Sequence, residues 1–258
     1  MADSFGALLK HWRGERRMSQ MELGLAANVS ARHISFLESG RATPSKAMII
    51  QLSDTLNVPR GNRNALLSAA GFAQAYAARN LEDEELRFVR EAMDWTLQRH
   101  CPYPAIAFDR HWTLVRMNAV SEALLGGFGL SVGDSLLEAL VVNGPFANAL
   151  ANRDEIAAHL VTRLRTESAF YGGDPVLDAA ADRLHGSVDN DRVDSGDPPA
   201  IISAQYVANG ITLSLFTTIA SFGSTEDIAL ADLKIEFMFP ADDATRNSLQ
   251  AQFAALTH

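Results

Sequence analysis

The chain has 258 residues, of which 47% are hydrophobic and 21% are charged. This length and balance fit two globular domains and exclude a fibrous or largely disordered chain. The N-terminus has no uninterrupted apolar stretch of the signal-peptide kind, and no apolar run is long enough to span a bilayer. With Cys101 as its single cysteine, the chain cannot form an intramolecular disulfide, and we expect a cytoplasmic protein.

Charge is unevenly distributed along the chain. The net charge is −9, but residues 1–80 contain ten basic and five acidic side chains and therefore carry +5. The remaining residues carry −14. A basic head on an acidic body indicates that only the head contacts phosphate groups.

The first residues of the chain predict two short helices with clear start signals. Residues 5–16 have apolar side chains at helical spacing, and Ser4 precedes them as an N-cap. A second helix begins after Ser19, which forms a capping box with Glu22 three residues later. Asn28 then marks a tight turn, because asparagine tolerates the left-handed backbone conformation.

A third helix is predicted to begin after Ser30 and to end at Gly40, and a fourth opens after Ser45. Two short helices joined by a tight turn have the geometry of a helix-turn-helix. A small helical bundle that does not bind DNA would share this periodicity. The caps, the turn and the charge together favour the DNA-binding interpretation.

The stretch MSQMELGLAANVSARHISFLESGRATPS resembles the Cro/XRE family of helix-turn-helix proteins. The resemblance implies that the third helix lies in the major groove. There the guanidinium of Arg32 can donate two hydrogen bonds to guanine, and Phe36 can pack on a thymine methyl. The candidate DNA contacts are Ser19, Gln20, Ser30, Ala31, Arg32, His33, Ser35, Phe36 and Arg41. Glu38 is expected to pair with a basic residue such as Arg13 instead.

The rest of the chain is expected to change from helical to mixed structure. Residues 59–79 are predicted to continue as a helix that joins or dimerises the domains, and residues 83–100 form an amphipathic helix. The expected domains are 1–75 for the head, 76–101 for a linker or dimerisation helix, and 102–258 for the body.

The body has the pattern of an α+β domain of the PAS-like type, a five-stranded antiparallel sheet with helices. The Asn209-Gly210 pair predicts a hairpin, and residues 185–199 predict a polar loop. The expected strands are 105–110, 112–118, 200–208, 211–219 and 230–239, and the expected helices are 119–125, 135–150, 153–166, 175–184 and 242–256.

Four blocks of the chain resemble, in order, the MmyB-like regulators, which join an XRE-type head to a PAS-like ligand-binding domain. The blocks are ARHISFLESGRATPS, RNALLSAAGFA, YPAIAFDRHWTLVRMNA and SLFTTIASFGSTEDIALADLKIEFMFPADDAT. One departure is Asn152-Arg153, where such proteins often have Asn-Trp. If that tryptophan shapes the family's pocket, the ligand of this chain differs in size or identity.

The resemblance implies a fatty-acid-like or other lipophilic ligand in an apolar pocket with one polar anchor. Buried apolar residues need no ligand to explain them, so the plain hydrophobic core is the first interpretation of each candidate lining residue. The candidates are Phe108, Val115, Met117, Leu124, Phe146, Leu160, Leu213 and Phe216.

We expect neither an enzyme nor a bound cofactor or metal. The seven histidines lack metal-ligand spacing. A LexA-like self-cleaving repressor would need a Ser/Lys dyad, and Lys234 is the one lysine outside the head. Strand alternation places Lys234 on a solvated face with Asp232 and Glu236, which is unsuitable for a desolvated base.

The expected partners are double-stranded DNA with a palindromic operator, a second copy of the chain and a small lipophilic ligand, without membrane binding. Two alternatives stay open at this point. The body could serve only oligomerisation or protein partnership, or the chain could be the self-cleaving repressor.

Overall fold

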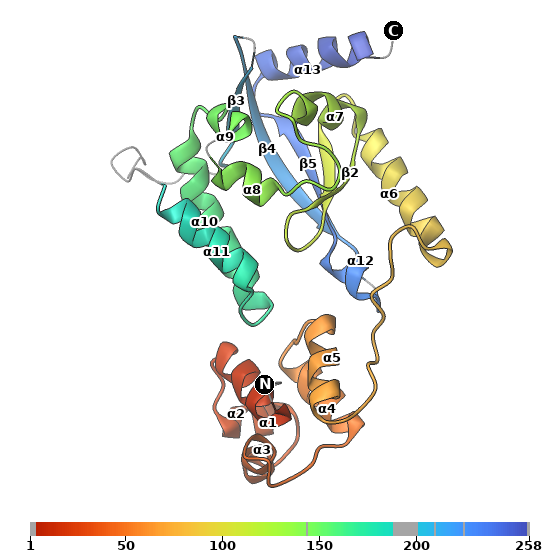
Figure 1. Ribbon diagram of the computed structural model, residues 1–258, viewed down its shortest axis with the longest axis vertical. Coiled ribbons are helices and arrows are strands. Elements are labelled where there is room, and N and C mark those ends of the chain that lie inside the picture. Colours follow the sequence, from red (N-terminus) through yellow and green to blue (C-terminus); the bar gives the residue numbers. More distant parts are fainter. Residues whose placement is uncertain (1–3, 143, 188–200, 209, 224, 257–258) are drawn as a thin grey trace. The chain divides into compact units, whose positions relative to one another are not determined.

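The computed structural model describes residues 4–142, 144–187, 201–208, 210–223 and 225–256 (Figure 1). Contacts divide the chain into two compact units. The first contains residues 1–78, 166–174 and 225–228, and the second contains residues 79–165, 175–224 and 229–258. None of the described helices is both long enough and apolar enough to cross a lipid bilayer.

The N-terminal part of the first unit is helical, and the predicted caps are present. Ser4, Ser19, Ser30 and Ser45 each accept a hydrogen bond from a backbone N–H three residues later, and Ser19 and Glu22 form the complete capping box. The helices are α1 (Phe5–Glu15), α2 (Gln20–Ala26), α3 (Ala31–Glu38), α4 (Lys46–Thr55) and α5 (Arg60–Ala69).

The turn between α2 and α3 is as tight as the sequence predicts. Asn28 has a φ of 51° and Gly40, after α3, has a φ of 72°. The backbone N–H of Val29 donates to the carbonyl oxygen of Gly24 at 2.7 Å. A Cβ on Gly24 would lie 2.6 Å from the carbonyl oxygen of Val29, so only glycine fits where the two helices meet.

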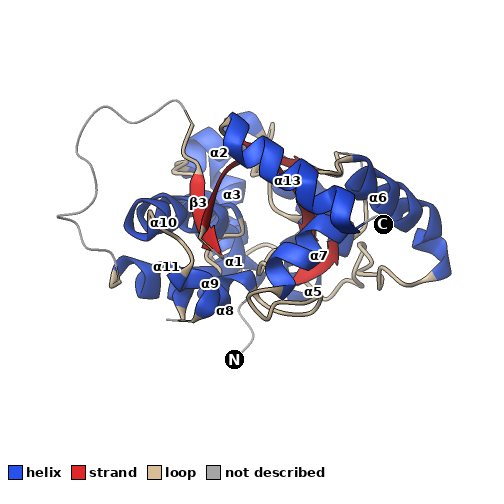
Figure 2. Ribbon diagram, turned by 90° about the horizontal axis from the view of Figure 1, so that it is seen from above, coloured by secondary structure: helices blue, strands red, loops and turns tan. Residues whose placement is uncertain are grey.

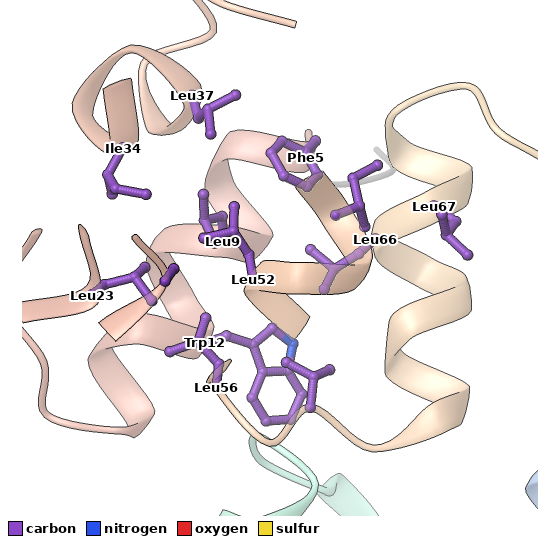
Figure 3. Packing of buried hydrophobic residues seen from close by; sticks show 13 residues of the cluster. Phe5, Leu9, Trp12, Leu23, Ile34, Leu37, Leu52, Leu56, Leu66 and Leu67 are labelled. Atoms are coloured by element: carbon purple, nitrogen blue, oxygen red, sulfur yellow. The ribbon is translucent and has the colours of Figure 1, made fainter. Parts of the chain in front are cut away.

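A single hydrophobic core holds the helical head together (Figure 3). Side chains from all five helices converge on it, and Trp12 is only 2% exposed. The other large buried side chains are Phe5, Leu9, Leu23, Ile34, Leu37, Ile49, Leu52, Leu56, Leu66 and Leu67.

The prediction that residues 59–79 continue as a helix is wrong beyond Ala69. Gly71 adopts a φ of 80°, and the chain then turns back along α5. The buried side chain of Asn64 accepts hydrogen bonds from the N–H groups of Ala75 and Tyr76 and donates to the carbonyl oxygen of Tyr76 at 2.7 Å. These bonds replace the helical ones that the segment would otherwise make.

The second unit contains a five-stranded sheet in the order β2-β1-β5-β4-β3, with every neighbouring pair antiparallel. This confirms the predicted α+β class, with a helical N-terminal region followed by an antiparallel sheet and helices. The strands are β1 (Ala105–Phe108), β2 (Leu114–Met117), β3 (Ala204–Ala208), β4 (Ile211–Ser221) and β5 (Lys234–Pro240).

Helices lie on both sides of this sheet. The 3-10 helix η1 (Glu84–Leu86) leads into α6 (Arg87–Arg99), close to the amphipathic helix predicted over residues 83–100. The other helices are α7 (Ala119–Gly126), α8 (Leu136–Val141), α9 (Pro145–Asn148), α10 (Arg153–Phe170), α11 (Pro175–His185), α12 (Ile228–Asp232) and α13 (Asp243–Leu256).

Two predicted elements differ from the structure. The single helix expected over 135–150 is divided into α8 and α9, because Pro145 cannot continue a helix and disfavours helical backbone at Gly144. The last strand begins at Lys234, since residues 228–232 form α12. Residues 188–200 and Asn209 lie outside the described residues, but Ala208 pairs with Ile211 as a two-residue hairpin requires.

The two faces of the sheet meet different helices (Figures 1 and 2). On one face, Met93 and Leu97 of α6 pack against Ala105, Ala107 and Ile235. Alternate residues of the same strands point toward α10 on the other face. The central strands β1 and β5 are therefore covered on both faces, whereas residues 217–221 of β4 are exposed.

Asn118 joins three elements at one end of this sheet. Its buried side chain accepts hydrogen bonds from the N–H groups of Ala105 and Ser121, at 3.2 and 2.9 Å. It donates to the carbonyl oxygens of Leu97 and Tyr103, at 3.2 and 2.8 Å. The end of α6, the start of β1 and the N-terminus of α7 are thereby fixed together, with the amide fully satisfied.

The close approach of α1 and α3 predicts opposite effects of the same substitution at two glycines of α1. A Cβ on Gly6 would lie 2.7 Å from the carbonyl oxygen of Leu37, so Gly6→Ala should destabilise the protein by about 1–3 kcal/mol. Gly14 has nothing within 4 Å of its Cβ position, so Gly14→Ala should stabilise it by about 0.5–1 kcal/mol. Calorimetric unfolding of the full chain measures both, and equal effects would contradict the close packing of α1 on α3.

Candidate DNA-binding face and ligand cavity

The outer face of α3 presents the residues that the sequence predicts to read DNA. Ile34 and Leu37 point into the core and are at most 1% exposed. Arg32 is exposed, and Ser35 and Phe36 are half-buried on the opposite face. The guanidinium of Arg32 lies 5.2 Å from the centre of the Phe36 ring, so the cation is held over an aromatic surface of the same helix.

The remaining predicted DNA contacts lie at the ends of α2 and α3. Ser19 and Ser30 are the exposed N-caps of these helices, where free backbone N–H groups favour phosphate. Ala31 and His33 occupy the first turn of α3 and are half-buried, and Arg41 is exposed just beyond Gly40. None of these positions is buried in the core of the head.

Glu38 holds α1, α2 and α3 together. Arg13 donates to both of its carboxylate oxygens, at 2.6 and 3.0 Å, as the sequence predicts. Gln20 donates to Oε2 at 2.8 Å, so its amide is part of this cluster. Arg13 also donates to the carbonyl oxygen of Met18 at 2.8 Å. The side chain of Glu38 is only 5% exposed, and the cluster fixes the angle at which α3 is presented.

The second unit encloses a mostly apolar cavity of about 120 Å³ between the sheet, α7, α8, α9 and α10. Trp112, Phe146, Leu160 and Met238 are among the large side chains that face it. Its apolar lining consists of Ile106, Trp112, Leu124, Leu125, Leu136, Leu140, Phe146, Ile156, Leu160, Ile202, Ala204, Leu215 and Met238.

Five polar side chains also line the cavity: His159, Arg163, Tyr206, Thr217 and Glu236. Both terminal nitrogens of Arg163 lie 3.4 Å from Oε2 of Glu236, and these two side chains are 17% and 12% exposed. The Arg163 guanidinium lies 4.2 Å from the centre of the Trp112 ring. Burial, and then the charge of Glu236, raise the pKa of Tyr206 above its usual range, which keeps its hydroxyl protonated.

The structure brings together three of the eight residues that the sequence predicts for the pocket. Leu124, Phe146 and Leu160 line the cavity. The other five do not belong to its lining, although Phe108 and Leu213 are buried nearby in the core. Val115 packs in the cluster around α6, and Phe216 stacks on Phe239. The remaining candidate outside the lining is Met117.

The polar lining of the cavity was not predicted from the sequence, although α10 contains a signal for it. Ile156, His159, Leu160 and Arg163 recur at i, i+3, i+4 and i+7 in α10, so they share one helix face, and two polar residues at such positions signal a site. Glu236 was assigned to a solvated face, whereas that face of β5 lines the cavity.

Two family models match the chain. A model described as the MmyB-like transcription regulator ligand binding domain matches residues 89–251, and a model of a helix-turn-helix domain matches residues 4–66. The protein is therefore a DNA-binding transcription regulator with a ligand-sensing domain. Since the first match covers more than half of the chain, the chain belongs to the family of MmyB-like transcription regulators.

Other comparisons add little. The chain is similar to a solved structure titled "Structure of the PAS domain from Bordetella pertussis BvgS", with 16% identity, 68% of this chain and 98% of that chain covered, and a TM-score of 0.29. A TM-score this low carries no argument. No curated protein matches the chain.

The Glu38 cluster predicts acid sensitivity of the helical head. Burial raises the pKa of Glu38, but hydrogen bonds from Arg13 and Gln20, together with the charges of Arg13 and Lys10, outweigh burial and leave the pKa below its usual value. A carboxyl whose pKa is depressed by folding stabilises the fold above its unfolded pKa, about 4.3, and this contribution is lost as the pH falls through the folded pKa.

Hydrogen exchange of the amides of residues 5–38, corrected for intrinsic rates, measures this effect. Protection in the unaltered protein should fall as the pH drops below about 4.3, the unfolded pKa. Glu38→Gln should have less protection at pH 7 and a flatter dependence on pH. Parallel pH curves for the two proteins would contradict the assignment.

Proposed function

We propose that this protein is a homodimeric transcription regulator that reads a palindromic operator through α3 and binds a small lipophilic ligand, such as a fatty acid, in its C-terminal domain. The observation that supports it best is the outer face of α3, where Arg32, Ser35 and Phe36 lie opposite the buried Ile34 and Leu37. In this proposal the protein acts in the cytoplasm and catalyses no reaction.

Charge and exposure support contact between the head and DNA. Residues 1–80 carry a net charge of +5, which attracts phosphate. Arg32 is placed to reach base edges in the major groove, and Arg41 to reach the phosphate backbone. The Ser19, Gln20, Ser30 and His33 contacts are proposed as backbone contacts of the same docking.

The apolar cavity supports the ligand part of the proposal. A lining with few polar groups suits a ligand that has an aliphatic chain. We propose the domain limits 1–75, 76–101 and 102–258, with ligand binding transmitted through the middle segment to the spacing of two heads. A body that serves only oligomerisation would need no such cavity, so the cavity favours ligand binding over that alternative.

The outer face of α6 supports a dimer. We use this term for Phe88, Ala92, Trp95 and Arg99 of α6 together with Glu84 of the preceding η1, which are all exposed. Phe88 is 71% exposed and Trp95 is 62% exposed, although large aromatic side chains are normally buried. The opposite face of α6 is buried, because Met93 and Leu97 pack on the sheet.

A second copy of the chain fits this face because the face is self-complementary. An antiparallel pair of α6 helices with its twofold axis beside Ala92 places Phe88 against Trp95 of the partner subunit. The same axis places Glu84 against Arg99 of the partner subunit, so opposite charges meet at both ends. Four aromatic side chains at ~150–250 Å² each approach the ~1,000 Å² of a specific interface.

Loss of Trp95 should weaken the dimer. Trp95→Ala is expected to raise the dimer dissociation constant at least about tenfold, because a central tryptophan typically contributes 2 kcal/mol or more. Val132→Ala is the matched control, since Val132 is 49% exposed elsewhere in the same unit, and it should leave the constant unchanged. Analytical ultracentrifugation of the full chain measures both variants.

A charge exchange tests the antiparallel arrangement. Arg99→Glu alone should weaken the dimer, and the addition of Glu84→Arg should restore part of the loss. A dimer unaffected by Trp95→Ala would place the interface elsewhere.

Two arginines of the head should affect DNA binding differently. Arg32→Ala should cost about 1–3 kcal/mol of operator binding and relax the base preference at one position of each half-site. Arg41→Ala should weaken binding about equally across sequences and lower the salt dependence. Selection of binding sites from random DNA, followed by titration at several salt concentrations, measures both; equal loss on specific and non-specific DNA for Arg32→Ala would refute its role as a reader.

A further inference from the structure

Two oppositely charged side chains of the ligand cavity are paired with each other. Arg163 comes from α10 and Glu236 from β5, and they meet with nitrogen–oxygen distances of 3.4 Å. Both side chains line the cavity, and both are mostly buried. Arg163 therefore already has a carboxylate partner before a ligand enters the cavity.

A carboxylate would disturb this pairing. Placed beside Arg163, it would also lie beside Glu236, and a second negative charge would enter a largely apolar space. Burial of an unpaired charge is far more costly than burial of a hydrogen-bonded neutral group. The anion would have to compete with Glu236 for Arg163, leaving one of the two carboxylates without a full partner.

An uncharged polar group has no such conflict. Tyr206 faces the cavity from β3 and offers a protonated hydroxyl. Thr217 offers a second hydroxyl from β4. These groups can donate to a carbonyl oxygen or accept from an amide or hydroxyl while Arg163 and Glu236 remain paired.

We propose that the cavity selects an aliphatic ligand whose head group is uncharged, such as an amide, an ester or an alcohol, over the corresponding free carboxylate. This inference rests on the proposed ligand-binding function of the cavity. It also makes the ligand more specific. The fatty acid expected from the sequence should bind more weakly than an uncharged ligand with the same aliphatic chain.

Octanamide and octanoate test the proposal, because they have the same chain and nearly the same shape but differ in charge. Calorimetric titration of the full chain at pH 7.5 should show that octanamide binds at least about tenfold more tightly than octanoate. Glu236→Gln keeps the shape of the side chain and removes its charge. This variant should bind octanoate at least about tenfold more tightly than the unaltered protein does, with little change for octanamide.

Glu122→Gln is the matched control. Glu122 is exposed on α7 and does not line the cavity, so this substitution changes the net charge equally and should alter neither affinity. The comparison of the two ligands on the unaltered protein stands even if Glu236→Gln does not fold.

The outcomes distinguish selection for a neutral head group from the binding of an aliphatic ligand itself. Octanoate that binds the unaltered protein as tightly as octanamide overturns the selection for a neutral head group and leaves the ligand-binding function intact. The same holds if Glu236→Gln folds and gains no affinity for octanoate. Failure of both ligands to bind the unaltered protein and Glu236→Gln overturns the proposed aliphatic ligand itself, and with it this inference.

Discussion

The constraint on which the second unit depends is that both faces of β1 and β5 are covered. Side chains alternate across a strand with a period of two, so β1 and β5 must each provide one row of residues for α6 and another for the cavity. In β5, Ile235 packs in the α6 cluster whereas Glu236 and Met238 line the cavity. A polar residue in such a strand has no solvated face to occupy, which is why Glu236 is paired with Arg163.

The helical head satisfies a different requirement, because α3 is too short to be stable alone. Helix α3 has eight residues, and its orientation depends on what holds it from behind. Ile34 and Leu37 anchor it in the core, and Glu38 connects it to Arg13 and Gln20. The close approach at Gly6 removes the remaining freedom between α1 and α3. The outer face of α3 therefore has no role in the core.

How far the sequence predicted the structure depends on whether the signal was local. Caps and turns are local, so Ser19, Ser30 and Asn28 were correctly placed. The end of α5 was missed because it depends on the side chain of Asn64, which binds backbone atoms more than ten residues away. In the cavity, Leu124, Phe146 and Leu160 were found as apolar residues of helices. Glu236 was not, since periodicity shows which residues share a face but not whether that face is solvated or covered.

Because of the same alternation, only the thickness of the sheet separates the cavity from the side chains that pack against α6. Ile106 and Glu236 are cross-strand partners that line the cavity, whereas the adjacent pair Ala107 and Ile235 packs in the α6 cluster. Any shift of these strands that accommodates a ligand must therefore be matched by the residues against α6, since close-packed interiors transmit rather than absorb displacement. A ligand can bias α6 only by as much as it binds one arrangement more tightly than another. The paired charges of Arg163 and Glu236 are suited to that discrimination, because their separation is sensitive to small movements of α10 over the sheet.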